Sequence, residues 1–236
     1  MHRTDFDPRR LYVIGGVAAL AQLVAILALL AVQAALGPAP AGPEEYFVIY
    51  QRNPLEMLLR GNFLLLFLLA AYLGTFPALY VALRRFHPLA VSYATLLTVI
   101  AVVGFFGAES TFALYHLAGQ YASATTESVR AQLVAAGYAL IASDSWNGSA
   151  AYLGGVLLQG SGVLISWVML RSRDFSRVTA ISGLLGNGFD LVQHLLHPFV
   201  PAVSAPIQLV MGVFYFVWFP MLARDFFRLA RGRGTD

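Results

Sequence analysis

The sequence has no cysteine and no lysine, and charged residues make up only 11% of its 236 positions. Without cysteine, the chain forms no disulfide and has no thiolate for catalysis or metal binding. Without lysine, it cannot form the Schiff base that retinal pigments and lysine-dependent enzymes use. Soluble globular chains carry about 25% charged residues. Hydrophobic residues reach 58% here, so we expect lipid to surround most of the surface.

The apolar residues fall into six segments long enough to cross a bilayer. This pattern predicts an all-α polytopic membrane protein, a six-transmembrane-helix bundle that forms a single integral membrane domain over 1–236. No small-residue cleavage site follows the first segment, so we interpret it as a retained span. Two outer amphipathic segments, 37–60 and 119–145, would connect spans; in the second, Thr125 or Thr126 would cap a helix. The predicted spans are about 11–36, 61–83, 88–117, 146–170, 178–200 and 205–223.

The arginines predict the orientation. Twelve of the fifteen fall on the side of the two termini, and only Arg52, Arg60 and Arg130 fall on the other. Basic loops of membrane proteins stay in the cytoplasm, so we expect both termini to be cytoplasmic, in a bacterial-type inner or plasma membrane. The net charge of +3 then reflects the membrane ends, and no nucleic-acid partner is expected. The expected partners are the lipid bilayer and either further copies of the chain or a larger membrane complex.

The fifth predicted span carries Asn187, Asp190, His194 and His197 on one helical face, within an arc of roughly 80°. Ionisable groups inside a membrane segment are costly, and they usually face the protein interior. In the third span, Glu109 and His116 are seven residues apart and share a face. The predicted topology places these groups toward the outer surface and leaves the inner halves almost purely apolar. The candidate polar cluster is Glu109, His116, Asp190, His194 and His197.

A metal site is one interpretation of this cluster. Asp190, His194 and His197 offer one carboxylate and two imidazoles, and Glu109 and His116 could complete the site. Zinc in catalytic sites takes three such ligands and a water, whose lowered pKa makes it a hydrolytic nucleophile. The residue types resemble those of intramembrane metal hydrolases of the ceramidase and adiponectin-receptor type. Those proteins have seven spans and a His-x-x-x-His pair, whereas this chain has six and His194-x-x-His197.

Three other interpretations stay open. His116 with either His194 or His197 could act as paired axial ligands of a haem. Asp190, Glu109 and the histidines could form a proton or ion relay in a transporter. Alternatively, pairs such as Asp190–Arg60 or Glu109–His194 could stabilise the bundle without chemistry. The last interpretation predicts a structural, ligand-binding or complex-subunit role, and the sequence leaves open whether the protein is an enzyme.

Glycines punctuate the fourth and fifth spans, and small residues let helix backbones approach closely in lipid. We therefore expect these two spans to pack against each other. The glycines are Gly154, Gly155, Gly160 and Gly162 in the fourth span, and Gly183, Gly186 and Gly188 in the fifth.

Three stretches carry a resemblance to a known family. PALYVALRR closes the second span, QYASATTESVRAQLVAAGYALIA lies in the second outer segment, and VLISWVMLRSRDFSRVTAISGLLGN joins the fourth and fifth spans. In these stretches and in its six-span layout, the chain resembles the uncharacterised bacterial integral membrane proteins grouped as domain of unknown function 4386. The resemblance covers most of the chain and implies the same fold and topology. It implies no site residues, because that family has no established activity.

Overall fold

The computed structural model describes residues 7–144, 148–200, 202 and 204–232. Every secondary-structure element in these ranges is a helix, as predicted. The elements are α1 (Pro8–Leu36), α2 (Pro43–Arg52), α3 (Pro54–Arg60), α4 (Phe63–Leu83), α5 (Pro88–Ala108), α6 (Thr111–Ser123), α7 (Glu127–Ala142), α8 (Ser149–Leu170), α9 (Arg177–Leu196) and α10 (Ser204–Ala230).

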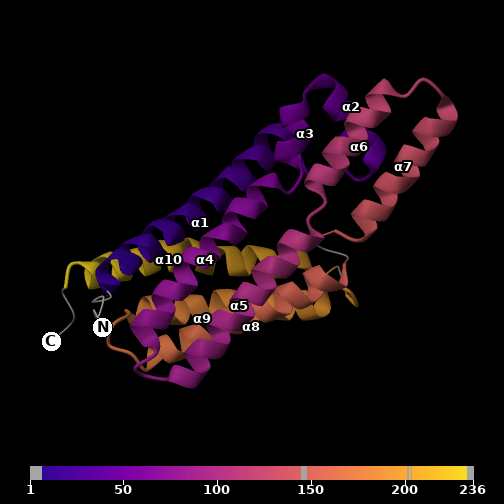
Figure 1. Cartoon of the computed structure of the whole chain (residues 1–236). Coiled ribbons are helices and arrows are strands. Elements are labelled where there is room, and N and C mark those ends of the chain that lie inside the picture. Colours follow the sequence, from indigo (N-terminus) through magenta and orange to yellow (C-terminus); the bar gives the residue numbers. More distant parts are fainter. Residues whose placement is uncertain (1–6, 145–147, 201, 203, 233–236) are drawn as a thin grey trace, which may run out of the picture.

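Six long helices form a closed ring, which we call the bundle. Around the ring, α1 contacts α4, α4 contacts α5, and the sequence continues through α8, α9 and α10 back to α1. The short helices α2, α3, α6 and α7 form a separate lobe at one end, which we call the cap (Figure 1). The first and last described residues lie together at the opposite end of the bundle (Figure 1).

The chain is a multi-pass helical membrane protein by helix length and hydropathy. Among the described residues, five stretches are long and apolar enough to cross a membrane: Pro8–Leu36, Phe63–Leu83, Pro88–Ser123, Ser149–Leu170 and Pro206–Ala230. Their outward faces carry exposed large apolar side chains, such as Val24 on α1, Leu89 on α5 and Leu209 on α10. Such faces would be unfavourable in water, and lipid is the solvent that suits them.

The predicted fifth span, 178–200, corresponds to α9 and does not reach the hydropathy of the other five. Its inward face is the reason, because it carries Thr179, Ser182, Asn187, Asp190 and Gln193, all of them buried. Its opposite face exposes Val178, Ile181, Val192 and Leu195. The structure therefore shows five apolar spans where the sequence predicted six, with α9 enclosed between α8 and α10.

The predicted third span, 88–117, is not one helix. α5 ends at Ala108, Glu109 is extended with φ −74° and ψ 122°, and α6 begins at Thr111. The Glu109 carboxylate accepts hydrogen bonds from Thr111 N at 2.9 Å and from Thr111 Oγ1 at 2.6 Å. A side chain that bonds to the backbone two residues later competes with the helix, and this explains the break.

The fourth and sixth predicted spans correspond to α8 and α10. The fourth was expected to begin at residue 146, but α8 begins at Ser149, and 145–147 lie outside the described residues. The sixth was expected to end at 223, whereas α10 continues to Ala230. The seven extra residues, 224–230, continue the helix, and Phe226 among them is fully buried in the bundle.

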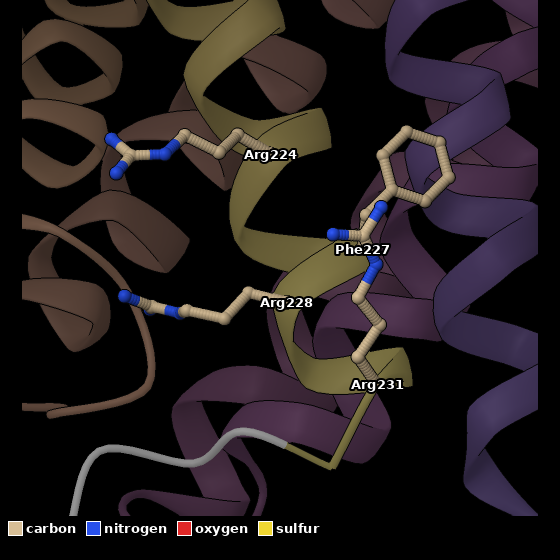
Figure 2. Close-up of a pocket in the computed structure, with 4 residues that line it drawn as sticks. All are labelled: Arg224, Phe227, Arg228 and Arg231. Carbon is tan, nitrogen blue, oxygen red and sulfur yellow. The ribbon is translucent and has the colours of Figure 1, made fainter.

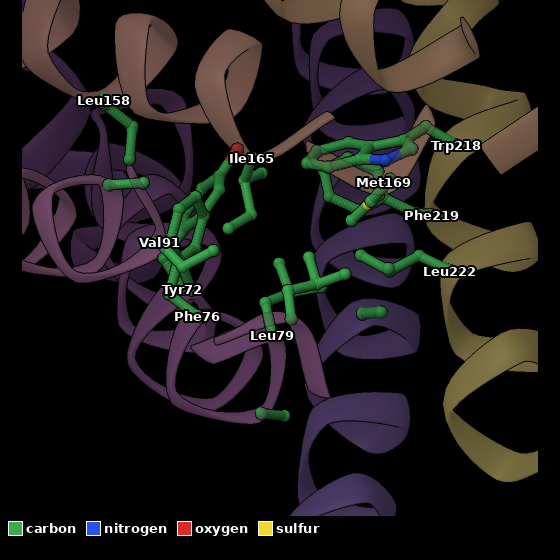
Figure 3. Close-up of a cluster of buried hydrophobic side chains, with 14 of the residues drawn as sticks. Tyr72, Phe76, Leu79, Val91, Leu158, Ile165, Met169, Trp218, Phe219 and Leu222 are labelled. Atoms are coloured by element: carbon green, nitrogen blue, oxygen red, sulfur yellow. The ribbon is translucent and has the colours of Figure 1, made fainter. Parts of the chain in front are cut away.

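The bundle core is built from side chains of α4, α5, α8 and α10. Figure 3 shows Tyr72, Phe76 and Leu79 facing Val91, Leu158 and Ile165, with Met169, Trp218, Phe219 and Leu222 alongside. Alanines fill the closest approaches between helices, among them Ala78, Ala94 and Ala101. Small residues at such contacts let neighbouring helices approach closely.

The cap has its own core, formed by Tyr46, Phe47 and Ile49 from α2, Met57 from α3, and Leu114 and Ala118 from α6. α7 starts as predicted, because the Thr126 side chain accepts a hydrogen bond from Val129 N and Glu127 lies in the first turn. Burial raises the pKa of Tyr46 to about 12, and the nearby charges of Asp144 and Glu109 act in the same direction. Tyr46 therefore remains a neutral donor in this core at any physiological pH.

Candidate functional site

The interface between α8 and α9 runs in strict antiparallel register. A Cβ at Gly155 would overlap the imidazole of His194, a Cβ at Gly162 would overlap the amide of Asn187, and one at Gly183 would meet Ser166 and Trp218. Seven residues separate Gly155 from Gly162, and seven separate His194 from Asn187. The predicted packing of these two spans is confirmed. It depends on particular glycines, since Gly160 and Gly188 meet nothing within 4 Å.

Asp190 is the centre of a buried polar cluster that joins three helices. Its Oδ2 accepts a hydrogen bond from the Tyr215 hydroxyl of α10 at 2.8 Å. Tyr215 Oη also lies 3.0 Å from Oε1 of Gln159 on α8. Asp190 is 7% exposed, Tyr215 8% and Gln159 6%, so these groups have left both water and lipid. We call Asp190, His194, Tyr215 and Gln159 the Asp190 cluster.

His194 is held by Asp190 and by the shape of α8. Its Nδ1 lies 3.1 Å from Asp190 Oδ1 and 3.0 Å from the backbone oxygen of Asp190. Both neighbours are acceptors, so Nδ1 carries the proton in the tautomer that fits this site. The ring fills the notch that Gly155 leaves in α8.

His197 belongs to a different contact. It caps the end of α9, and its Nδ1 lies 2.9 Å from Oγ of Ser204 at the start of α10. The one-face pattern in the sequence is correct, yet the helix end turns this imidazole toward α10 and not toward Asp190.

Glu109 and His116 do not join the Asp190 cluster. Glu109 bonds Thr111 at the break between α5 and α6, and His116 Nε2 lies 3.0 Å from Gln120 Nε2. α6 packs on α2, α3 and α7, whereas α9 packs on α8 and α10. The suggested pair Asp190–Arg60 is not formed, because Arg60 pairs with Glu45 and Glu56. His194 pairs with Asp190, and the suggested pair Glu109–His194 stays a prediction.

These positions bear on the metal and haem interpretations. In 7–144, 148–200, 202 and 204–232, no three His, Asp or Glu side chains gather closely enough to hold a metal ion. Zinc needs at least three protein ligands around one point, and Asp190, His194 and His197 do not supply them. The metal interpretation therefore gains no support from the described residues, and the metal and haem interpretations stay predictions.

Polar side chains continue along α9 toward the arginine-rich end, where the sequence predicted an almost purely apolar interior. Asn187 Nδ2 donates to Gly183 O at 2.7 Å, and Ser182 Oγ donates to Val178 O at 2.7 Å. Thr179 Oγ1 donates to Oδ2 of Asp225 at 2.6 Å, and Asp225 is 1% exposed. A buried polar face therefore follows the whole length of α9 and extends beyond the candidate cluster.

Ion pairs and hydrogen bonds join the helices and the loop at the arginine-rich end of the bundle. Asp174, in the loop between α8 and α9, accepts from the Arg85 guanidinium at 2.6 Å and 2.7 Å. Asp225 also accepts from the backbone N of Ser176 at 2.9 Å and lies 3.3 Å from Arg228. These contacts tie the end of α4 and the start of α9 to α10.

Sequence reasoning missed Tyr215, Gln159 and Asp225. Tyr215 resembled a packing aromatic, and Asp225 resembled part of a basic tail. Gln159 gave a usable signal, because it is a lone amide in an apolar span and such groups are costly in lipid unless they are bonded.

No protein-family model, no curated protein and no solved structure matches this chain. The resemblance to the family grouped as domain of unknown function 4386 therefore stays a prediction, and the function has to be inferred from the chemistry of the site.

Proposed function

We propose that the protein is a structural or binding subunit of the membrane and that the Asp190 cluster holds α8, α9 and α10 in one arrangement. The observation that supports this most is that Asp190 uses both carboxylate oxygens within the protein, one on Tyr215 and one on His194. The imidazole is seated against Gly155 with no intervening space. A substrate or metal would have to displace bonds that the cluster already makes.

The proposal includes a membrane arrangement. We infer that α9 is a sixth membrane-embedded helix, because it is as long as its neighbours and closes the ring between α8 and α10. We infer further that the arginine-rich end is cytoplasmic and the cap is on the other side, in an inner or plasma membrane. The contacts of Arg85 and Arg228 with Asp174 support this, since they join the end of α4, the loop between α8 and α9, and α10, which lie on one predicted side.

Buried polar pairs serve such a role because they specify one packing arrangement. Apolar helix faces in lipid can slide and rotate against each other with little change in free energy. A carboxylate placed in hydrocarbon without its partners raises the free energy by roughly several kcal/mol. The antiparallel register of Gly155 with His194 and Gly162 with Asn187 is the geometric result. A subunit that presents a fixed surface to a partner or a further copy needs this kind of specificity.

Asp190→Asn tests the proposal, because asparagine keeps the shape of aspartate and removes its charge. We expect the variant to be inserted and folded but to unfold at a lower temperature in detergent, since His194 loses its charged partner. The control is Asn62→Asp at the start of α4, a change of similar size, which shows whether expression and purification alone alter the unfolding temperature. An Asp190→Asn protein that unfolds at the same temperature as the wild type would contradict a packing role.

A second function, proton-coupled transport, is favoured by the polar face of α9. It runs from Asp225 and Thr179 at one end to His197 and Ser204 at the other. Gln193 is fully buried, and among the described residues its side-chain N and O have no hydrogen-bond partner. Carboxylates and imidazoles in such a line can pass protons.

Proton flux into liposomes distinguishes the two functions. A transporter would acidify vesicles loaded with a pH-sensitive dye, and Asp190→Asn would abolish the flux while Asp174→Asn, at the loop, would not. A packing role predicts no flux above that of empty vesicles for either protein.

A further inference from the structure

One face of α10 changes from apolar to basic along its length. Val210, Val217, Arg224 and Arg231 follow each other at intervals of seven residues and are all exposed. Residues seven apart on an α-helix lie on nearly the same side. The same strip of surface therefore contacts lipid at Val210 and Val217 and presents guanidinium groups about two and four turns further on.

The basic part of this strip forms a cavity of about 410 Å³ lined by Arg224, Phe227, Arg228 and Arg231. In Figure 2 the side chains of Arg224 and Arg228 extend in parallel from successive turns, and Arg231 rises beside the ring of Phe227. Arg224 and Arg228 extend to one side of α10 in this view, Arg231 and Phe227 lie on the other, and all four line the cavity at the end of the helix.

The charges in this cavity are unevenly neutralised. Arg228 is held by the protein, since its guanidinium donates to the backbone oxygen of Asp174 and lies 3.3 Å from Asp225. In the part of the chain that the structure describes, neither Arg224 nor Arg231 has an acidic partner within 4.0 Å. Three like charges on adjacent turns repel each other, and an anion between them would relieve the repulsion.

We propose that this cavity binds the phosphate of an anionic phospholipid headgroup. Guanidinium groups match phosphate oxygens in a bidentate way, and basic pockets at the ends of membrane helices attract anionic headgroups. The cavity lies next to an apolar strip of α10, and this favours a lipid as the ligand. The acyl chains of the lipid would lie along Val217 and Val210 while its phosphate reaches Arg224 and Arg231. Phe227 forms the apolar wall beside the headgroup.

The test is the unfolding temperature of the detergent-purified protein with added phosphatidylglycerol, phosphatidylcholine or inorganic phosphate. We expect phosphatidylglycerol to stabilise the wild type and phosphatidylcholine to have little effect. In Arg224→Gln/Arg231→Gln, the apparent affinity for phosphatidylglycerol should fall on the order of tenfold to thirtyfold. Native mass spectrometry of the same samples should show fewer retained phosphatidylglycerol molecules in the double variant.

The matched control is Arg10→Gln/Arg52→Gln, which removes two exposed charges outside the cavity. It should bind phosphatidylglycerol like the wild type. Equal stabilisation by inorganic phosphate, lost in the double variant, would support the phosphate site but overturn the lipid as its occupant. Unchanged phosphatidylglycerol affinity in Arg224→Gln/Arg231→Gln would overturn the whole proposal, and the single variant Arg231→Gln gives the same readout should the double variant fail to fold.

Discussion

The hydroxyl of Tyr215 lies 2.8 Å from Oδ2 of Asp190, and this bond joins α10 to α9 deep inside the bundle. Tyr215 Oη is also 3.0 Å from Gln159 Oε1, so one phenol connects three helices. A single hydroxyl proton cannot serve both acceptors fully. With Asp190 ionised, the phenol donates to the carboxylate; with Asp190 protonated, the carboxyl can donate to the phenol and the phenol to Gln159.

Tyr215→Phe should lower stability. The change removes one oxygen and leaves Asp190 Oδ2 buried without its donor, which costs about 1–3 kcal/mol. Unfolding in detergent, followed by circular dichroism, measures the effect. Tyr93→Phe is the control, because Tyr93 is 55% exposed on the lipid face of α5 and should change stability by less than about 0.5 kcal/mol. Equal effects of the two changes would show that the hydroxyl of Tyr215 contributes nothing specific.

Gly155→Ala should destabilise the protein, whereas Gly160→Ala on the same helix should not. A methyl group at 155 overlaps the His194 ring, but one at 160 meets nothing within 4 Å. Overpacking costs typically about 1–3 kcal/mol, and alanine is the better helix former by about 1 kcal/mol. The difference between the two unfolding free energies tests the register of α8 against α9. A Gly160→Ala protein as unstable as Gly155→Ala would mean that helix α8 faces another way.

The two ion pairs of the arginine-rich end should differ in strength. Asp225 is 1% exposed and receives bonds from Thr179 and Ser176, so Asp225→Ala should cost roughly 3–5 kcal/mol by removing the acceptor at the start of α9 and the carboxylate beside Arg228. Arg85 has a side chain that is 66% exposed, and Arg85→Ala should cost about 0–1 kcal/mol. Chemical denaturation of both variants measures the contrast, and a larger loss for Arg85→Ala would reverse our ranking.

Elemental analysis tests the metal interpretation directly. We expect no stoichiometric zinc and no haem absorbance in the purified protein, because Asp190 bonds His194 and Tyr215 while His197 bonds Ser204. His194→Ala/His197→Ala provides the comparison. One equivalent of zinc in the wild type that disappears in the double variant would restore the hydrolase alternative.

Local signals in the sequence predicted much of the fold. Apolar runs predicted the long helices, Thr126 predicted the start of α7, and the glycines predicted that α8 packs on α9. The helix break at Glu109 was missed because hydropathy does not detect a carboxylate that accepts a hydrogen bond from the backbone of Thr111. α9 falls below the hydropathy of the five apolar spans because it has one face suited to lipid and another suited to a protein interior.

The site was predicted only in part, for a physical reason. Helical spacing placed Asp190 and His194 on one face, and they do pair. Spacing within one helix cannot show what lies opposite, so Tyr215 and Gln159 were invisible until α10 and α8 were placed beside α9. The same limit allowed His197 to be counted with Asp190, although the end of α9 directs it to Ser204.

The central claim is that Asp190 and Tyr215 act together to fix helix packing, and a double-mutant cycle measures this most directly. Unfolding free energies of the wild type, Asp190→Asn, Tyr215→Phe and the double variant would be compared in one detergent. We predict a favourable coupling of about 0.6–1.7 kcal/mol, the range found for hydrogen bonds between membrane helices. A coupling near zero, with both single variants as stable as the wild type, would contradict the account.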